Sequence, residues 1–180
     1  RAMTGYKNYF EGHGEFCVRA SPAYIDTGSI PWKAFDKARG SESWHSLSNY
    51  SSGVYTGSST LGGIRGDYLV LKLPYKINLK SIAMVPRQGL PQRGPGTGVI
   101  LGSNDEANWE QVHSFSGITY TDNVYATINI NTTKKYSVFA MVVTNLAGIG
   151  VNTDYSNLAE WKLFGTREQG QSVLHDGQLT

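Results

Sequence analysis

The sequence predicts an all-β protein, a sandwich of packed sheets, and three observations lead to that prediction. Short runs rich in Val, Ile, Leu, Tyr and Phe recur with turn residues between them, which is typical of sandwiches and barrels. Glycine accounts for 21 of the 180 residues and tyrosine for 11, a composition that favours many short strands joined by turns. No segment has its apolar residues at the spacing of an amphipathic helix.

The first expected strands are close together, at 67–75 and 76–85. In DYLVLKLPY, Leu69, Leu71 and Leu73 occupy alternate positions, the period of a strand with one buried face. Three more runs follow and are separated by turn residues. These further strands are expected at 98–104, 109–115 and 125–130.

The last two expected strands differ in pattern. The run YSVFAMVVT, 136–144, is apolar at odd and even positions, as a strand covered on both faces would be. In LAEWKLFG, 158–165, Ala159, Trp161 and Leu163 alternate with the other side chains, which indicates one buried face. The first of these strands is therefore expected at the centre of the sandwich.

The pattern divides the chain into three parts. Residues 1–19 are expected to be an irregular extension, residues 20–165 the sandwich, and residues 166–180 a linker or the start of a further element, because Asp-Gly within SVLHDGQLT is a hairpin signal. Inside the sandwich, 47–66 is a long loop of Ser, Gly and Tyr. Loops of that length in compact domains are usually functional or disordered.

Composition and motifs exclude several functions. The net charge is +2 and no cluster of Lys and Arg is long enough to bind nucleic acid. No apolar run approaches the roughly 18 residues of a membrane span, and the single cysteine, Cys17, excludes an intrachain disulfide. The sequence contains neither a G-x-S-x-G elbow nor an H-E-x-x-H pair nor a phosphate-binding loop, so we expect no enzyme activity.

Five short motifs follow one another within residues 34–165. In order, they are AFD…W, GDYLVLKLP, IAMVPR, GVILGSNDEANW and NLAEWKLFG. Together they resemble the discoidin family, or F5/8 type C domains, and most closely its bacterial branch, carbohydrate-binding module family 32. The resemblance spans residues 20–165 and implies a galactose-binding-like jelly-roll β-sandwich. Lys37 departs from the family's glycine, and the cysteines of the animal branch are missing, which favours the bacterial or viral lectin-like branch.

The resemblance implies a structural calcium ion that joins the AFD loop to the last strand. Asp36 and Glu160 match the family's carboxylate ligands, and Ser41 or Glu42, with Ser43 as a neighbour, would supply a third side chain. Calcium takes about 6–8 oxygen ligands, many of them backbone carbonyls. The alternative is that Asp36 caps a turn and Glu160 is a solvated edge residue.

The resemblance also implies a sugar site at the loop end of the sandwich. A guanidinium offers a rigid set of donors, an imidazole donates or accepts, and an aromatic ring covers the C–H face of a sugar. The alternatives are core packing for Trp44 and ordinary surface roles for the others. The expected ligand-binding residues are His45, Arg87, Gln92, Arg93, Tyr155 and Tyr50, with Tyr55 beside the last.

The function expected from this resemblance is non-catalytic binding of a carbohydrate or glycoconjugate, of the galactose type, outside the cell, on a cell surface or on a virion. One alternative is a structural or host-attachment domain, such as the fibre head of a viral or phage particle, which would be an oligomer or part of a larger chain. Another is the phospholipid- or protein-binding mode of animal relatives. That mode needs exposed apolar loop tips, and 47–66 offers mainly Ser, Gly and Tyr.

Overall fold

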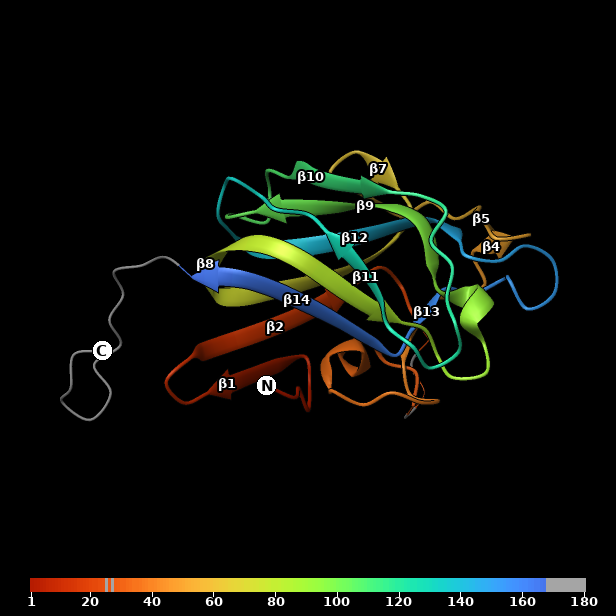
Figure 1. The fold of residues 1–180 in the computed structure, drawn as a ribbon, viewed down its shortest axis with the longest axis horizontal. Coiled ribbons are helices and arrows are strands. Elements are labelled where there is room, and N and C mark those ends of the chain that lie inside the picture. Colours follow the sequence, from red (N-terminus) through yellow and green to blue (C-terminus); the bar gives the residue numbers. More distant parts are fainter. Residues whose placement is uncertain (25, 27, 168–180) are drawn as a thin grey trace.

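A computed structural model describes residues 1–24, 26 and 28–167, which fold into two layers of antiparallel strands (Figure 1). Two short 3-10 helices, η1 (Pro31–Phe35) and η2 (Pro91–Arg93), lie in the connections. The strands are β1 Lys7–Phe10, β2 Gly14–Ala20, β3 Trp44–His45, β4 Tyr50–Ser51, β5 Val54–Tyr55, β6 Thr60–Leu61, β7 Ile64–Arg65, β8 Asp67–Val85, β9 Pro95–Ser103, β10 Glu110–Phe115, β11 Ala126–Asn129, β12 Tyr136–Leu146, β13 Asn157–Leu158 and β14 Glu160–Arg167. The expected all-β sandwich is confirmed.

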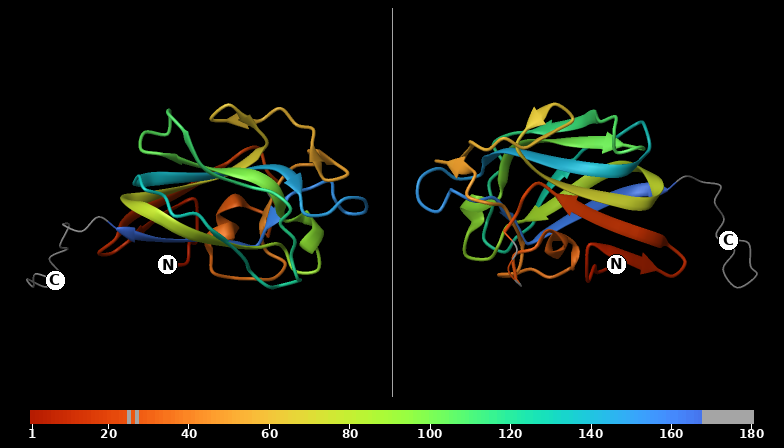
Figure 2. Two further views of the ribbon diagram at one scale, coloured as in Figure 1. Left: turned by 45° about the horizontal axis from the view of Figure 1, so that its top comes forward. Right: turned by 180° about the vertical axis from the view of Figure 1, so that it is seen from behind.

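The long strand β8 belongs to both layers. Its first part pairs with β2 and β12, and β12 continues the layer to β9 and β10. Its second part pairs with β14 on one side and β11 on the other. The strand bends between the two parts, so the layers face each other from either side of the bend (Figure 2).

The core fills the space between the layers. Leu69, Ile82 and Met84 of β8 have no exposed surface, and Trp161 of β14 is almost as deeply buried. On β12, Phe139 belongs to this core. Alternation in the sequence therefore reports the inward face of each strand, because successive side chains point to opposite faces of a sheet.

A second, smaller cluster explains why β12 is apolar on both faces. Val138, Ala140 and Val142 face away from the main core and pack with Val70 and Leu101. Side chains of the β6–β7 hairpin cover this cluster. The expectation of a central strand covered on both sides is confirmed.

Two expected elements are corrected. Residues 1–19 are not an irregular extension, because β1 and β2 form a hairpin whose second strand, over Cys17–Ala20, pairs with β8. This pairing is long-range and leaves no repeating pattern in the local sequence. The expected strands 67–75 and 76–85 are one strand, and Pro74 lies in the bend between the ladder pairs of Lys72 and Ile77, where a missing backbone N–H disrupts no pairing.

The long polar loop is also more ordered than expected. Residues 47–66 form the hairpins β4–β5 and β6–β7 instead of a single irregular loop. Of the expected linker at 166–180, Thr166 and Arg167 complete β14, and 168–180 lie outside the described residues. None of the helices within the described ranges has the length and apolar character needed to cross a membrane.

Candidate functional site

Four loop-end segments converge at one end of the sandwich, where β13, β4 and β5 also lie (Figure 1). They contribute His45 from β3, Arg87 from the turn after β8, Arg93 from η2 and Tyr155 from the loop before β13. The short ladder β13–β3 pairs Asn157 with His45 and so places the Tyr155 loop beside the imidazole. Sequence-distant residues therefore meet because two short strands pair.

The hydrogen bonds of His45 define its protonation. Its Nδ1 lies 2.9 Å from the carbonyl oxygen of Ser46, which can only accept, so Nδ1 carries the proton. Nε2 is therefore an acceptor, and Nη1 of Arg93 donates to it at 3.4 Å. The buried imidazole and the guanidinium thus form a hydrogen-bonded acceptor and donor at the loop end of the sandwich.

Arg93 connects three parts of the cluster. Its guanidinium lies 5.1 Å from the centre of the Tyr155 ring, and its Nε donates to the carbonyl of Asn152 at 3.0 Å. The Tyr155 ring in turn lies 4.9 Å from the His45 ring. Cation–π contact and a charge-assisted hydrogen bond both restrict the guanidinium, so the site is largely preformed.

The electrostatics of the site are positive. Burial lowers the pKa of His45, and the charges of Arg93 and Arg87 lower this pKa further. Burial and the charge of Arg87 also lower the pKa of Arg93. Within the described part of the chain, neither arginine forms an ion pair with a carboxylate. A neutral imidazole therefore lies beside two guanidiniums without an ion-pair partner, although the charge of Asp154 acts on Arg93 and that of Asp26 acts on His45.

The other expected ligand residues lie elsewhere or act differently. Gln92 lies in η2 and accepts the N–H of Gly148 through its backbone carbonyl, which fixes the 147–155 loop. Tyr50 is a correction: it is 4% exposed, its hydroxyl donates to Val143, and its ring packs edge-on against Tyr55. Both tyrosines of the β4–β5 hairpin point into the core, a direction that the hairpin register decides and the sequence does not reveal.

Three residues of the site were not expected from the sequence. The ring of Tyr24, half exposed, lies 5.6 Å from that of His45. Asn152 supplies the carbonyl that holds Arg93. The side chain of Asn157 accepts the backbone N–H of Arg87 at 3.1 Å, and its buried Nδ2 has no partner within the described ranges. Only Asn157 lies within a recognisable motif, NLAEWKLFG.

The AFD loop brings two of the expected calcium ligands together. Glu160 is buried and accepts the backbone N–H of Lys37 at 2.9 Å, and Lys37 has a positive φ of 66°. Burial, with a contribution from the charge of Asp36, raises the pKa of Glu160 to about 8. A buried carboxyl group beside a second carboxylate fits a hard cation, which would favour the ionised form of Glu160.

The other two expected ligands do not join this pair. The carboxylate of Glu42 contacts the ammonium of Lys33, which also lies 3.6 Å from Asp36 Oδ2, and Ser41 is exposed. In the residues that the structure describes, no group of three or more His, Cys, Asp or Glu side chains could hold a metal ion. Any calcium ion here would take its remaining ligands from backbone oxygens.

The state of His45 leads to a prediction about pH. Since the folded pKa of His45 lies below the ordinary value of about 6.5, the unfolded chain takes up the proton first as the pH falls, and His45 makes the fold less stable below that pH. Protonation also removes the Nε2 acceptor and adds a third positive charge beside Arg87 and Arg93. Ligand affinity should therefore fall as the pH drops below about 6.5, measured by calorimetry at constant ionic strength.

A matched pair of variants separates this effect from general acid damage. His45→Asn should bind more weakly but lose the pH dependence, because an amide does not titrate in this range. His113→Asn, on β10, should retain it. Equal pH profiles for wild type and His45→Asn would contradict the assigned role.

Several proteins of known structure have a similar fold. No protein-family model and no curated protein matches the chain. Among solved structures, the module CpGH89CBM32-5 from Clostridium perfringens, in complex with GalNAc-β-1,3-galactose, is 17% identical over 83% of this chain and 95% of its own, with a TM-score of 0.62. The family 32 carbohydrate-binding module of C. perfringens NanJ, in complex with galactose, is 17% identical over 82% and 92%, with a TM-score of 0.56.

A vertebrate lectin has a similar structure. The fucolectin from striped bass (Morone saxatilis) serum is 16% identical over 84% of this chain and 47% of its own, with a TM-score of 0.60. At these identities the likeness concerns the fold. The described part of the chain therefore has the galactose-binding-like β-sandwich fold of carbohydrate-binding modules and F-type lectins.

Proposed function

We propose that this chain is a non-catalytic carbohydrate-binding domain that recognises a galactose-type sugar with His45, Arg87, Arg93 and Tyr155. The observation that carries the proposal is the pairing of a buried, neutral His45 with Arg93, whose Nη1 donor lies 3.4 Å from the Nε2 acceptor. An acceptor next to a rigid set of donors complements vicinal hydroxyl groups, each of which both donates and accepts.

Each side chain has a distinct part in this binding. His45 Nε2 accepts a hydroxyl proton, and the guanidiniums of Arg87 and Arg93 donate to sugar oxygens. Tyr155 offers an aromatic surface to the C–H groups of the ring. The galactose-containing ligands of the two C. perfringens modules support this class of sugar.

A glycan array tests the proposal directly. The wild-type domain should bind terminal galactose or N-acetylgalactosamine, and His45→Ala and Arg87→Ala should lose that signal, whereas His113→Ala should keep it. A single shallow site binds weakly, so multivalent display on the array is needed to detect it. Absence of binding to any glycan by folded wild-type protein would refute the proposal.

We further propose that Asp36 and Glu160 hold a structural calcium ion. The ion would fix the AFD loop to β14 and would take no part in binding the sugar. An ion at 100 times its Kd would stabilise the fold by about 2.7 kcal/mol. Thermal unfolding should shift upward by several degrees when calcium replaces EDTA. Glu160→Gln should abolish the shift and Glu42→Gln should retain it, since Glu42 faces Lys33.

One observation favours a second candidate, the phospholipid- or protein-binding mode. Ile149 and Val151 are 85% and 83% exposed, and Val54 on the neighbouring hairpin is 51% exposed. Ile149 and Val151 lie on the 147–155 loop, outside the 47–66 segment, whereas Val54 lies within that segment, on β5. Sedimentation with phosphatidylserine vesicles tests this mode, and Ile149→Ser with Val151→Ser should abolish any binding that depends on the tips.

A further inference from the structure

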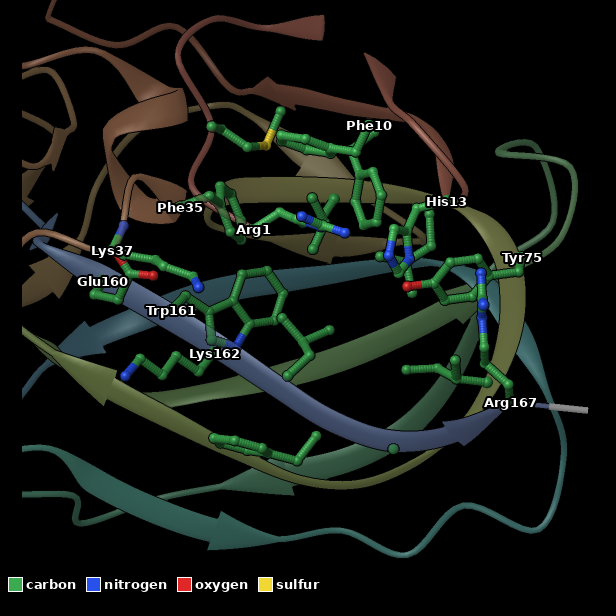
Figure 3. A pocket seen from close by; sticks show the side chains of 18 residues that line it. Arg1, Phe10, His13, Phe35, Lys37, Tyr75, Glu160, Trp161, Lys162 and Arg167 are labelled. Carbon is green, nitrogen blue, oxygen red and sulfur yellow. The ribbon is translucent and has the colours of Figure 1, made fainter. Parts of the chain in front are cut away.

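A cavity of about 750 Å³ lies between the β1–β2 hairpin and β14 and shares no residue with the His45–Arg93 site (Figure 3). Its volume falls within the range of about 300–1,000 Å³ that is common for small-molecule sites. The walls come from the N-terminal hairpin, η1, β8 and β14. Buried or half-buried apolar side chains form most of them: Met3, Phe16, Phe35, Leu71, Leu73 and Trp161.

Aromatic rings stiffen these walls. The Phe10 and Phe16 rings lie 5.4 Å apart, and Phe16 lies 6.0 Å from Tyr75, both in edge-to-face geometry. Phe35 and Trp161 lie 5.7 Å apart on the opposite part of the lining. Rings held by such contacts give the cavity a fixed apolar surface.

Positive charge surrounds this apolar surface. Lys37 and Glu160 lie at one end of the cavity, Arg167 and Tyr75 at the other, and Arg1 between them (Figure 3). Among the described lining residues Glu160 is the only acidic one, and Lys162 is a fourth cation, whose ammonium lies 4.4 Å from the centre of the Tyr125 ring. Within the described ranges, none of the four cations forms an ion pair with a side-chain carboxylate. The Arg167 guanidinium is held 3.4 Å from the centre of the Tyr75 ring.

We infer that this cavity binds a monoanionic amphiphile, an organic acid with an apolar chain or ring. The apolar body packs on the aromatic walls, and the acid group lies near Arg1 and Arg167. The apolar cavity therefore favours a ligand with an apolar chain or ring, and the cations without ion-pair partners favour a ligand with a negative charge. The inference is independent of the proposed sugar site.

Titration calorimetry with three probes of equal chain length tests the inference: decanoate, 1-decanol and decyltrimethylammonium, each below its micelle concentration. Decanoate should bind and change the intrinsic tryptophan fluorescence, since Trp161 lines the cavity. The neutral alcohol should bind at least about tenfold more weakly, because it has no negative charge to pair with the guanidiniums, and the cation should not bind. Absence of decanoate binding, or equal binding of decanol, would overturn the inference.

Variants locate the probe. The double variant Arg1→Gln, Arg167→Gln should weaken decanoate binding about tenfold or more. Removing two exposed lysines elsewhere, by Lys80→Gln with Lys134→Gln, should leave it unchanged. Leu163→Trp should fill the cavity and block decanoate, with unaltered circular dichroism as the check on folding. Unchanged affinity in the arginine double variant or in folded Leu163→Trp would exclude this cavity as the site.

Discussion

Replacing Arg93 by alanine is expected to lower sugar affinity by about 10- to 100-fold. The substitution removes charge-assisted hydrogen bonds to the ligand, each worth about 1.5–3 kcal/mol, and leaves the His45 acceptor without its neighbouring donor. It also removes the cation above the Tyr155 ring and the bond to Asn152 that holds the loop. Calorimetry against the best glycan from the array measures the loss.

Arg65 provides the matched control for this prediction. Its guanidinium also lies over a tyrosine ring, 5.8 Å from the centre of Tyr55, and also donates to backbone carbonyls, those of Gly57 and Thr56. Arg65→Ala therefore removes the same kinds of contact without touching the site, and sugar affinity should not change. Similar losses in both variants would show that Arg93 acts only through general loop stability.

Replacing Phe139 by alanine is expected to cost about 3–5 kcal/mol of the free energy of unfolding. Phe139 has no exposed surface, lies on the central strand β12 and packs edge-on against Tyr136. Because β12 pairs with both β8 and β9, the layers cannot close around the vacated volume without disturbing two ladders. Urea unfolding at constant pH measures the change.

Phe164 is the control, because its ring on β14 is 49% exposed. Phe164→Ala should lower the free energy of unfolding by less than about 1.5 kcal/mol, since much of that ring remains in water when the chain folds. Equal losses in the two variants would mean that β12 does not lie at the centre of the core.

The two proposed binding regions have different physical origins. The proposed sugar site consists of loop side chains around His45 and Arg93, and its contacts depend on the short β3–β13 ladder. The cavity lies where the N-terminal hairpin leaves apolar faces of β8 and β14 incompletely filled. Ligands of the two regions should therefore bind independently, with Arg93→Ala leaving decanoate affinity unchanged.

The sequence identified most strands of the sandwich and named four residues that the structure brings together, His45, Arg87, Arg93 and Tyr155. Alternation of apolar residues is a local property, so the buried faces of β12 and β14 could be recognised without a structure. The order of the motifs predicted the fold, and the structural neighbours have that same fold.

The tertiary structure decided everything that depends on pairing between distant segments. The Tyr50 side chain points into the core, and the N-terminal hairpin pairs with β8 through its second strand. The carboxylate of Glu42 contacts Lys33 and does not join Asp36 and Glu160. The direction of a side chain at a loop end follows from register and turn geometry, which long-range contacts set. For the same reason only the structure revealed the pairing of His45 with Arg93 and the positively charged apolar cavity beside Trp161.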